Sequence, residues 1–224
     1  MAFYIDDENI SLLELRERIQ DTDLVPSRAS LLDKIEANFK SLEQQGITSL
    51  AALRYELKTS RRLETLSGKT KIDTQYLVLL RREIESYFPK PVALNKFDWF
   101  PQGEISKLND SEVRNNVGLY HAIEDAGSLS ELAGSTGADP AFLETFARLV
   151  DLTRIQWVSP LTARMLAEAG FDSTDKVAGA NPEDLCEALM RVNEGNKYFK
   201  GKVGLRDIKR LIKSAGYLLK HSAN

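Results

Sequence analysis

The chain has 224 residues, of which 42% are hydrophobic and 28% are charged, and its formal net charge is −3 at pH 7. This composition is typical of a soluble globular protein and excludes an intrinsically disordered chain, and the length suffices for one large domain or two small ones. No apolar run approaches the roughly 20 residues that a membrane-spanning helix needs, so we expect no insertion into a membrane.

The first ten residues and the single cysteine predict where the protein is located. Residues 1–10 contain Asp6, Asp7 and Glu8 but no Lys or Arg, whereas a secretory signal peptide begins with a basic region. Because Cys186 is the only cysteine, no intramolecular disulfide can form, which is typical of a reducing compartment. We therefore expect a cytoplasmic protein.

The hydrophobic pattern predicts helices along almost the whole chain. Apolar residues recur at three- and four-residue spacing, and the alternating Val, Ile and Thr runs that form strands are lacking. Helix starts are marked by side chains that can accept a hydrogen bond from a free backbone N–H group. They are the expected capping boxes Ser11–Glu14 and Ser128–Glu131 and the pairs Asp139–Pro140, Ser159–Pro160 and Asn181–Pro182.

Helix ends are marked by glycine and proline. Gly46, Gly127 and Gly170 stand where a helix is expected to end in a left-handed residue. Pro89-Lys90-Pro91 cannot be helical, so the preceding helix should end near Phe88. This proline-rich stretch is also the candidate boundary between two domains.

One segment of the chain is repeated. Residues 66–77 align with residues 132–143, and a shortened copy occupies residues 177–185. In each copy we expect a helix to close at the Gly and an Asp or Asn to cap the next helix. A residue of that next helix, Tyr76, Phe142 or Leu185, should then enter the core. The copies predict a fold built from helical repeats.

The stretch from Leu152 to Ser173, with Trp157-Val158-Ser159 at its turn, resembles the helix-hairpin-helix motif. Together with residues 181–193 it resembles the uncharacterised DUF4332 family. The similarity covers residues 128–219 and extends more loosely over residues 23–82. The resemblance implies a fold of helix-hairpin-helix-like repeats and implies no particular activity.

The turn of this motif decides whether a phosphate can approach. In helix-hairpin-helix proteins that bind DNA, two glycines let backbone N–H groups contact a phosphate at a helix N-terminus. Trp157 and Ser159 occupy those positions here, so the turn is either purely structural or a modified phosphate contact. We expect Trp157 to be substantially buried. We also expect the segment from Ile155 to Gly170 to form a helix, a tight turn and a second helix.

The C-terminal part of the chain is basic. Residues 191–224 contain nine Lys or Arg residues and two acidic ones, a net charge of +7, which leaves −10 for the rest of the chain. On the predicted C-terminal helix, Arg206, Lys209, Arg210 and Lys213 fall on the face opposite the apolar one. This basic face either contacts an anionic partner, docks on the acidic remainder of the protein, or is solvated.

The sequence shows no motif for catalysis or for metal binding. His121, His221 and Cys186 are the only residues with an imidazole or a thiol, which is too few for a metal cluster. No glycine-rich phosphate-binding loop and no nucleophile motif is present. We therefore expect no enzyme, no metal, no cofactor and no small-molecule substrate.

These observations predict an all-α protein of tandem helix-hairpin-helix-like (SAM-domain-like) repeats in two related halves, residues 1–92 and 93–224. The leading hypothesis is a scaffold that binds a protein partner. The alternative is nucleic-acid binding, without sequence specificity, through the turn at residues 155–163 and the basic helix at residues 205–220. The residues predicted to contact nucleic acid are Gln156, Ser159, Arg164, Lys200, Lys202, Arg206, Lys209, Arg210 and Lys213.

Overall fold

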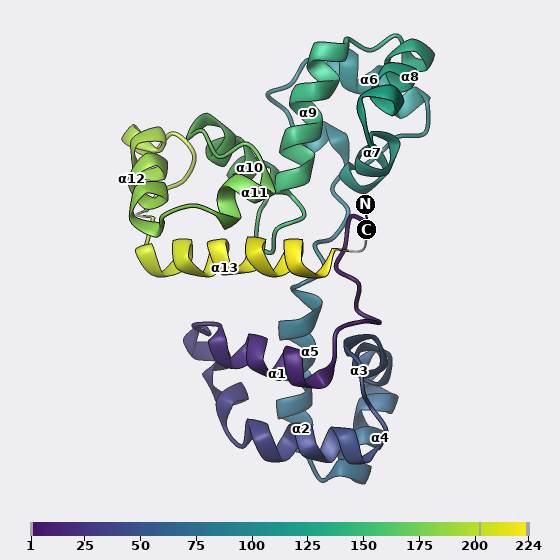
Figure 1. Cartoon of the computed structure of the whole chain (residues 1–224), viewed down its shortest axis with the longest axis vertical. Helices are drawn as coiled ribbons and strands as arrows, with labels where there is room; N and C mark the ends of the chain where they lie inside the picture. Colours follow the sequence, from purple (N-terminus) through teal and green to yellow (C-terminus); the bar gives the residue numbers. More distant parts are fainter. Residues whose placement is uncertain (1, 202, 223–224) are drawn as a thin grey trace. The chain divides into compact units, whose positions relative to one another are not determined.

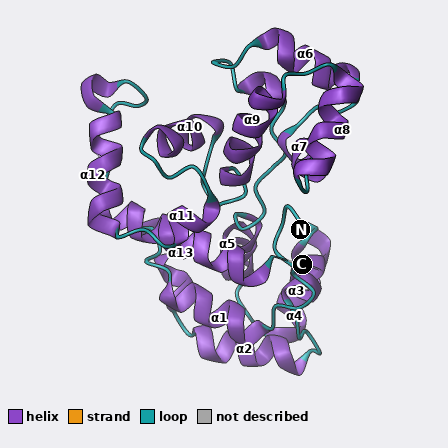
Figure 2. Cartoon of the chain, turned by 45° about the horizontal axis from the view of Figure 1, so that its top comes forward, coloured by secondary structure: helices purple, strands orange, loops and turns teal. Residues whose placement is uncertain are grey.

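The computed structural model describes residues 2–201 and 203–222. Over these residues the regular secondary structure is helical, apart from isolated β-bridges such as those of Ser11 with Ser49 and of Ala93 with Asn115 (Figure 2). The predicted all-α fold class is confirmed. The chain divides into two compact units, Ile5–Phe88 (the N-terminal unit) and Pro89–Asn224 with Met1–Tyr4 (the C-terminal unit).

The N-terminal unit is a bundle of short helices around one apolar core (Figure 1). Its first helix starts at the predicted capping box, in which Ser11 Oγ accepts from the Glu14 N–H at 3.2 Å. Leu15, Ile19 and Phe39 are fully buried in the core. The helices of the unit are α1 (Leu12–Asp21), η1 (Pro26–Leu32), α2 (Ile35–Gln44), α3 (Leu50–Leu57), α4 (Ser60–Thr70) and α5 (Thr74–Glu85).

The C-terminal unit contains the remaining helices. They are η2 (Leu94–Lys96), α6 (Gln102–Asp110), α7 (Asn116–Ala122), α8 (Ala126–Thr136), α9 (Pro140–Leu152), α10 (Pro160–Glu168), α11 (Thr174–Ala178), α12 (Pro182–Val192), η3 (Glu194–Asn196) and α13 (Leu205–His221). The helix α13, which is yellow in Figure 1, packs against α11 and α12. No helix formed by the described residues is both long enough and apolar enough to span a bilayer.

The segment that follows the proline-rich stretch is held by the C-terminal unit. The Asn116 N–H donates to the Val92 carbonyl at 2.9 Å, and the Val92 N–H donates to Asn116 Oδ1 at 2.8 Å. These hydrogen bonds place residues 92 onward in the C-terminal unit. The compact units accordingly divide between Phe88 and Pro89, whereas the expected first half ran to residue 92.

The junction between α4 and α5 has the same hydrogen bonds as the junction between α8 and α9. In the first junction the Thr70 hydroxyl donates to the Leu66 carbonyl at 2.8 Å. In the second the Thr136 hydroxyl donates to the Leu132 carbonyl at 2.6 Å. The two aligned segments therefore end their helices through one local mechanism.

The next residues of the two junctions also correspond. Lys71 and Gly137 both have a left-handed conformation, with φ of 61° and 68°. Asp73 then accepts from the Gln75 N–H at 2.7 Å, and Asp139 accepts from the Ala141 N–H at 3.0 Å. Each helix thus ends one residue before the left-handed position. The expectation that it closes at the preceding glycine is wrong.

The other predicted start and stop signals have mixed outcomes. Gly46 and Gly170 follow helix ends with φ of 78° and 91°, as predicted. The predicted capping box at Ser128 is wrong, because Asp125 caps α8 and accepts from the Ser128 N–H at 2.8 Å. Gly127 consequently lies in the first turn of α8 instead of ending a helix. An acidic residue three positions earlier offers the same capping geometry, and it sets the start of the helix.

Candidate functional site

The candidate site is built around the turn of residues 153–159 between α9 and α10. The Val158 N–H donates to the Ile155 carbonyl at 3.1 Å and closes the turn, and both of these side chains are buried. Between them, Trp157 has a left-handed backbone with φ of 70°. This conformation costs a residue with a Cβ roughly 1–2 kcal/mol and is adopted with ease only by glycine.

The predicted burial of Trp157 is wrong. Trp157 is 42% exposed, because Ile155 and Val158 fill the core positions of the turn and leave the indole outside. The expected helix at the start of this segment is also wrong, since α9 ends at Leu152 and residues 155–158 belong to the turn. The predicted second helix is present as α10, which ends before Gly170.

The start of α10 uses the predicted capping residue. Ser159 Oγ accepts from the Thr162 N–H at 3.1 Å, and Pro160 occupies the first helical position, where its missing N–H needs no partner. The Ser159 and Thr162 hydroxyl oxygens also lie 2.9 Å apart. The polar groups at this helix start are therefore engaged with one another.

Arg210 of α13 covers one side of the Trp157 indole. Its guanidinium carbon lies 4.4 Å from the ring centroid, a distance typical of a cation–π contact, and one of its nitrogens lies 3.5 Å from Asp207 Oδ1. The Arg210 side chain is only 12% exposed. The expectation that Arg210 projects from a solvent-facing stripe is wrong, because α13 turns it toward the residue 153–159 turn.

An apolar groove of about 500 Å³ opens beside this pair of side chains. Its walls come from α10, α12 and α13 and from the residues Tyr198, Phe199, Val203 and Gly204, all in the C-terminal unit. Leu161, at the start of α10, is 43% exposed at the groove although it is aliphatic. The lining residues are Trp157, Ser159, Leu161, Thr162, Met165, Leu189, Tyr198, Phe199, Val203, Gly204, Asp207, Ile208, Arg210 and Leu211.

A buried asparagine shapes the loop that forms one wall of the groove. Asn193 Oδ1 accepts from the Tyr198 N–H at 3.0 Å and from the Phe199 N–H at 3.2 Å, and its amide nitrogen donates to the Phe199 carbonyl at 3.2 Å. Three hydrogen bonds from one side chain fix the backbone at two successive aromatic residues. The two rings therefore stay at the groove.

Ion pairs attach the same loop to α10. Lys197 Nζ lies 2.7 Å from Glu168 Oε2, and Arg164 Nε donates to Glu168 Oε1 at 2.9 Å. Burial by itself raises the pKa of Glu168, but hydrogen bonds from Lys197, Tyr198 and Arg164 outweigh it, and the pKa falls from 4.5 to about 2. Glu168 is thus a carboxylate that bridges the loop and the helix.

The structure places the nine predicted contact residues in different environments. Gln156, which was predicted to contact nucleic acid, is 3% exposed and accepts a 3.4 Å hydrogen bond from the Ser214 hydroxyl, so the structure places it in the interior of the unit. Ser159 and Arg210 line the groove, whereas Arg164 is held against Glu168. The residues exposed at the surface are Lys200, Arg206, Lys209 and Lys213. Lys202 lies outside the described residues.

The apolar lining of the groove was missed by reasoning from the sequence. Met165, Leu189 and Ile208 have the helical spacing of core residues and are buried, so nothing distinguishes them from ordinary core residues. Leu161 was the one available signal, because it follows Pro160 in the first turn of a helix and precedes the polar Thr162.

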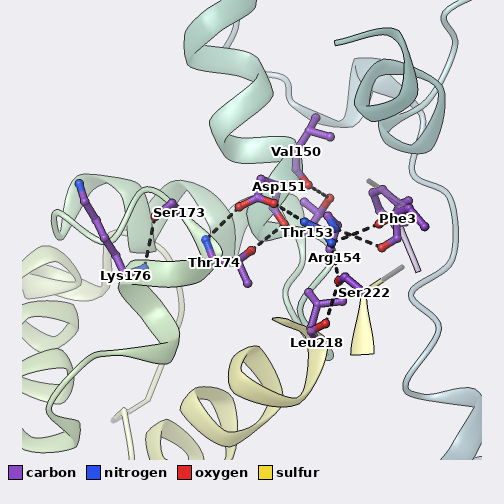
Figure 3. A network of polar contacts seen from close by, with 11 residues as sticks. Phe3, Val150, Asp151, Thr153, Arg154, Ser173, Thr174, Lys176, Leu218 and Ser222 are labelled. Carbon is purple, nitrogen blue, oxygen red and sulfur yellow. Dashed lines mark hydrogen bonds and ion pairs between the residues drawn. The ribbon is translucent and has the colours of Figure 1, made fainter. Parts of the chain in front are cut away.

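A second polar cluster surrounds the buried Arg154, which is 4% exposed, in the same unit (Figure 3). Its guanidinium donates to Asp151 Oδ1 at 2.6 Å and to the Ser222 hydroxyl at 2.9 Å, and it lies 4.5 Å from the Tyr120 ring centroid. Asp151 also accepts from the Thr174 N–H at 2.9 Å. These charges satisfy one another, so the cluster holds α9, α11 and the end of α13 together.

Comparison with known proteins gives one match. A family model described as a domain of unknown function, DUF4332, matches residues 102–218, just over half of the chain, and includes every residue that lines the groove. No curated protein and no solved structure matches the chain.

Proposed function

The chain belongs to the DUF4332 family, and we propose that it is a non-enzymatic protein-interaction module that binds a partner polypeptide in the groove beside Trp157. The family match names no ligand. The geometry of the groove supports a polypeptide ligand. We also propose that the protein is cytoplasmic, which its single cysteine supports.

The observation that carries the proposal is the exposed pair Trp157 and Leu161 at the groove. Two large apolar side chains are 42% and 43% exposed there, on either side of Ser159 and Pro160. The turn keeps the indole outside although its backbone conformation is unfavourable for a tryptophan. Tryptophan is enriched at the energetic centres of protein interfaces, and contiguous exposed apolar surface marks a contact site.

The dimensions of the groove favour a polypeptide segment. At about 500 Å³ it falls among pockets that enclose a ligand, and it opens along the start of α10 and of α13. Amphipathic helices bind such grooves by inserting apolar side chains from one face. The helix-hairpin-helix-like arrangement of α9, the turn and α10 would then present an apolar ligand site in place of a phosphate contact.

The proposal is tested by selecting peptides from a displayed random library against the whole protein. Leu161→Asp places a charge in the groove and should abolish binding of the enriched peptides. Leu13→Asp is the matched control, because Leu13 is an exposed leucine of α1 in the N-terminal unit. Selected peptides that bind wild type and Leu161→Asp equally would contradict the proposal.

Nucleic-acid binding is the second candidate function, supported by the exposed residues Arg206, Lys209 and Lys213 on α13. Contacts to phosphate release counterions, so each lost contact should lower the log–log salt slope of binding by roughly one unit. Lys209→Glu combined with Lys213→Glu should then abolish most binding of a DNA duplex. Wild-type protein that shifts neither duplex nor single strand at about 50 mM salt would end this candidate.

A further inference from the structure

We infer that the N-terminal unit binds single-stranded nucleic acid at the surface where α3 ends and α4 begins. The phosphates of the strand contact Lys58, Arg61 and Arg81, and one base stacks on Tyr55. The inference goes beyond the groove of the C-terminal unit and depends on none of its residues. Three observations carry it: the cations of this surface, the position of one of them in its helix, and the exposure of the tyrosine.

Cations from three neighbouring helices gather around the C-terminal end of α3. The helices α3, α4 and α5 pack against one another (Figure 1). Arg62 of α4 donates to the Tyr55 carbonyl at 3.2 Å, and Arg81 of α5 donates to the Leu57 carbonyl at 3.3 Å. Lys58 directly follows the last residue of α3. Side chains that are distant in the sequence therefore form one basic surface.

A hollow of about 470 Å³ opens at this surface, and its carboxylates are already paired. Lys58, Arg81 and Arg54 line it together with Asp7 and Glu85, so three cations face two carboxylates. Both carboxylates form ion pairs with Arg54. In the described part of the chain, neither Lys58 nor Arg81 forms an ion pair. Their charges are available to an anionic ligand, and an arginine matches a phosphate through two parallel N–H groups.

Arg61 lies where the helix dipole disfavours a cation. It is exposed in the first turn of α4, and that turn contains no acidic residue. The N-terminal end of a helix has a partial positive charge, so a cation lowers the stability of the helix there and a carboxylate raises it. Among the described residues, Arg61 forms no ion pair that would offset this cost. Its placement fits an anionic ligand better than a role in folding.

Tyr55 adds an aromatic ring to the same surface. It is 57% exposed and lines the hollow beside Lys58. The Arg62 guanidinium carbon lies 3.5 Å from the ring centroid, so Arg62 orients the ring and covers one of its faces. The other face is left to a base. Proteins bind single strands through cations that follow the backbone and aromatic rings that stack on bases, whereas an acidic peptide has no use for the ring.

The test measures binding of a fluorescein-labelled oligo(dT) of about 12 nucleotides to the full chain by fluorescence anisotropy. Lys58→Glu with Arg61→Glu should weaken binding at least about tenfold at about 50 mM salt, because two phosphate contacts are lost. The log–log salt slope should fall by about 1.4, since each contact to a single strand contributes about 0.7. Thermal unfolding should show no loss of stability in this variant, because a carboxylate suits the first turn of α4.

Tyr55→Ala should weaken binding at least about fivefold, since the loss of stacking on one base costs that much or more. The matched control is Lys40→Glu with Lys96→Glu, which makes the same change in net charge. Both lysines are exposed, on α2 and η2, and neither lines the hollow. The control should reduce the affinity far less than Lys58→Glu with Arg61→Glu does.

Several outcomes would overturn the inference. One is wild-type chain that does not bind the oligonucleotide at about 50 mM salt. Another is binding that persists in Lys58→Glu with Arg61→Glu and is lost in Lys209→Glu with Lys213→Glu, which would place the contacts on α13. Unchanged affinity in Tyr55→Ala, or equal displacement by polyglutamate at the same charge concentration, would show a surface for any polyanion. Each outcome leaves the proposed peptide groove standing, because the groove lies in the other unit.

Discussion

Arg154 Nε donates a hydrogen bond to the backbone carbonyl of Phe3, 3.2 Å away, although the two residues are 151 positions apart. A second guanidinium nitrogen donates to the Ala2 carbonyl at 3.2 Å. The start of the described chain is therefore part of the C-terminal unit and not of the helices that follow it directly. No pattern in the sequence marks this contact, because it joins an isolated arginine to backbone atoms.

Replacing Arg154 should strongly destabilise the C-terminal unit. Arg154→Met removes hydrogen bonds to two backbone carbonyls and to Ser222 and leaves Asp151 without its cation. Breaking one side of a buried charged network costs about 3 kcal/mol, which urea denaturation can measure. Arg148→Met is the control, because Arg148 is half exposed, and it should cost less than about 1 kcal/mol. An equal decrease in the free energy of unfolding of both variants would contradict the role assigned to Arg154.

The two equivalent junctions should respond equally to loss of their caps. Asp73→Ala and Asp139→Ala each remove the side chain that accepts a hydrogen bond from the first turn of a helix. Each should lower the free energy of unfolding by about 1 kcal/mol. Asp110→Ala is the control, because Asp110 is exposed at the end of α6 and caps no helix start, and it should change stability by less than about 0.5 kcal/mol. A large cost at only one junction would show that the surroundings, and not the cap, determine the effect.

Because Trp157 has a left-handed backbone, we expect glycine to be more stabilising than alanine at this position, the reverse of their usual order in a helix. Trp157→Gly should be more stable than Trp157→Ala by about 1 kcal/mol, because glycine adopts this conformation without strain. At Lys209, an exposed position inside α13, alanine should instead be more stable than glycine by about 1 kcal/mol. Thermal unfolding of the four variants measures both differences. The same order at the two positions would mean that Trp157 is not held in this conformation in solution.

Because Glu168 bridges the loop and α10 as a carboxylate, we expect the stability of the folded protein to depend on pH. Its pKa is lowered to about 2 in the folded protein, so the stability it contributes is present above its ordinary pKa of 4.5 and is lost as the pH falls toward about 2. Glu168→Gln should destabilise the protein at pH 6, and its difference from wild type should shrink steadily below pH 4.5, measured by urea denaturation. Glu131→Gln, at an exposed position of α8, is the control and should differ little from wild type at any pH. A Glu168→Gln difference that stays constant down to pH 2.5 would refute the bridge.

Much of the fold was predictable because helix termini depend on local sequence. Ser11, Asp139, Ser159 and Asn181 cap the helices that their sequence patterns indicated. Ser128 was misassigned for a local reason too, since Asp125 accepts from the Ser128 N–H and so starts the helix before Ser128. Local competition of this kind shifts a helix start by a few residues without changing the fold.

The site was less predictable because it depends on packing between distant helices. The helical spacing of α13 identifies its apolar face, where Ile208, Leu211, Ala215 and Leu218 are buried. It does not reveal that Arg210, at the border between the faces, lies over a tryptophan 53 positions earlier. The apolar groove arises only once α10, α12 and α13 are assembled. Spacing along one helix contains no information on the shape of the space between helices.

The position of Trp157 gives the groove its own optical reporter. The chain has two tryptophans, Trp99 and Trp157, so Trp99→Phe leaves a single indole as the source of tryptophan emission. That indole is partly in water and partly against the Arg210 guanidinium. A ligand that displaces the water around it moves the emission to shorter wavelength, whereas a ligand bound elsewhere leaves the spectrum unchanged. Occupancy of the groove can thus be followed by fluorescence in unlabelled protein, whatever the chemistry of the ligand.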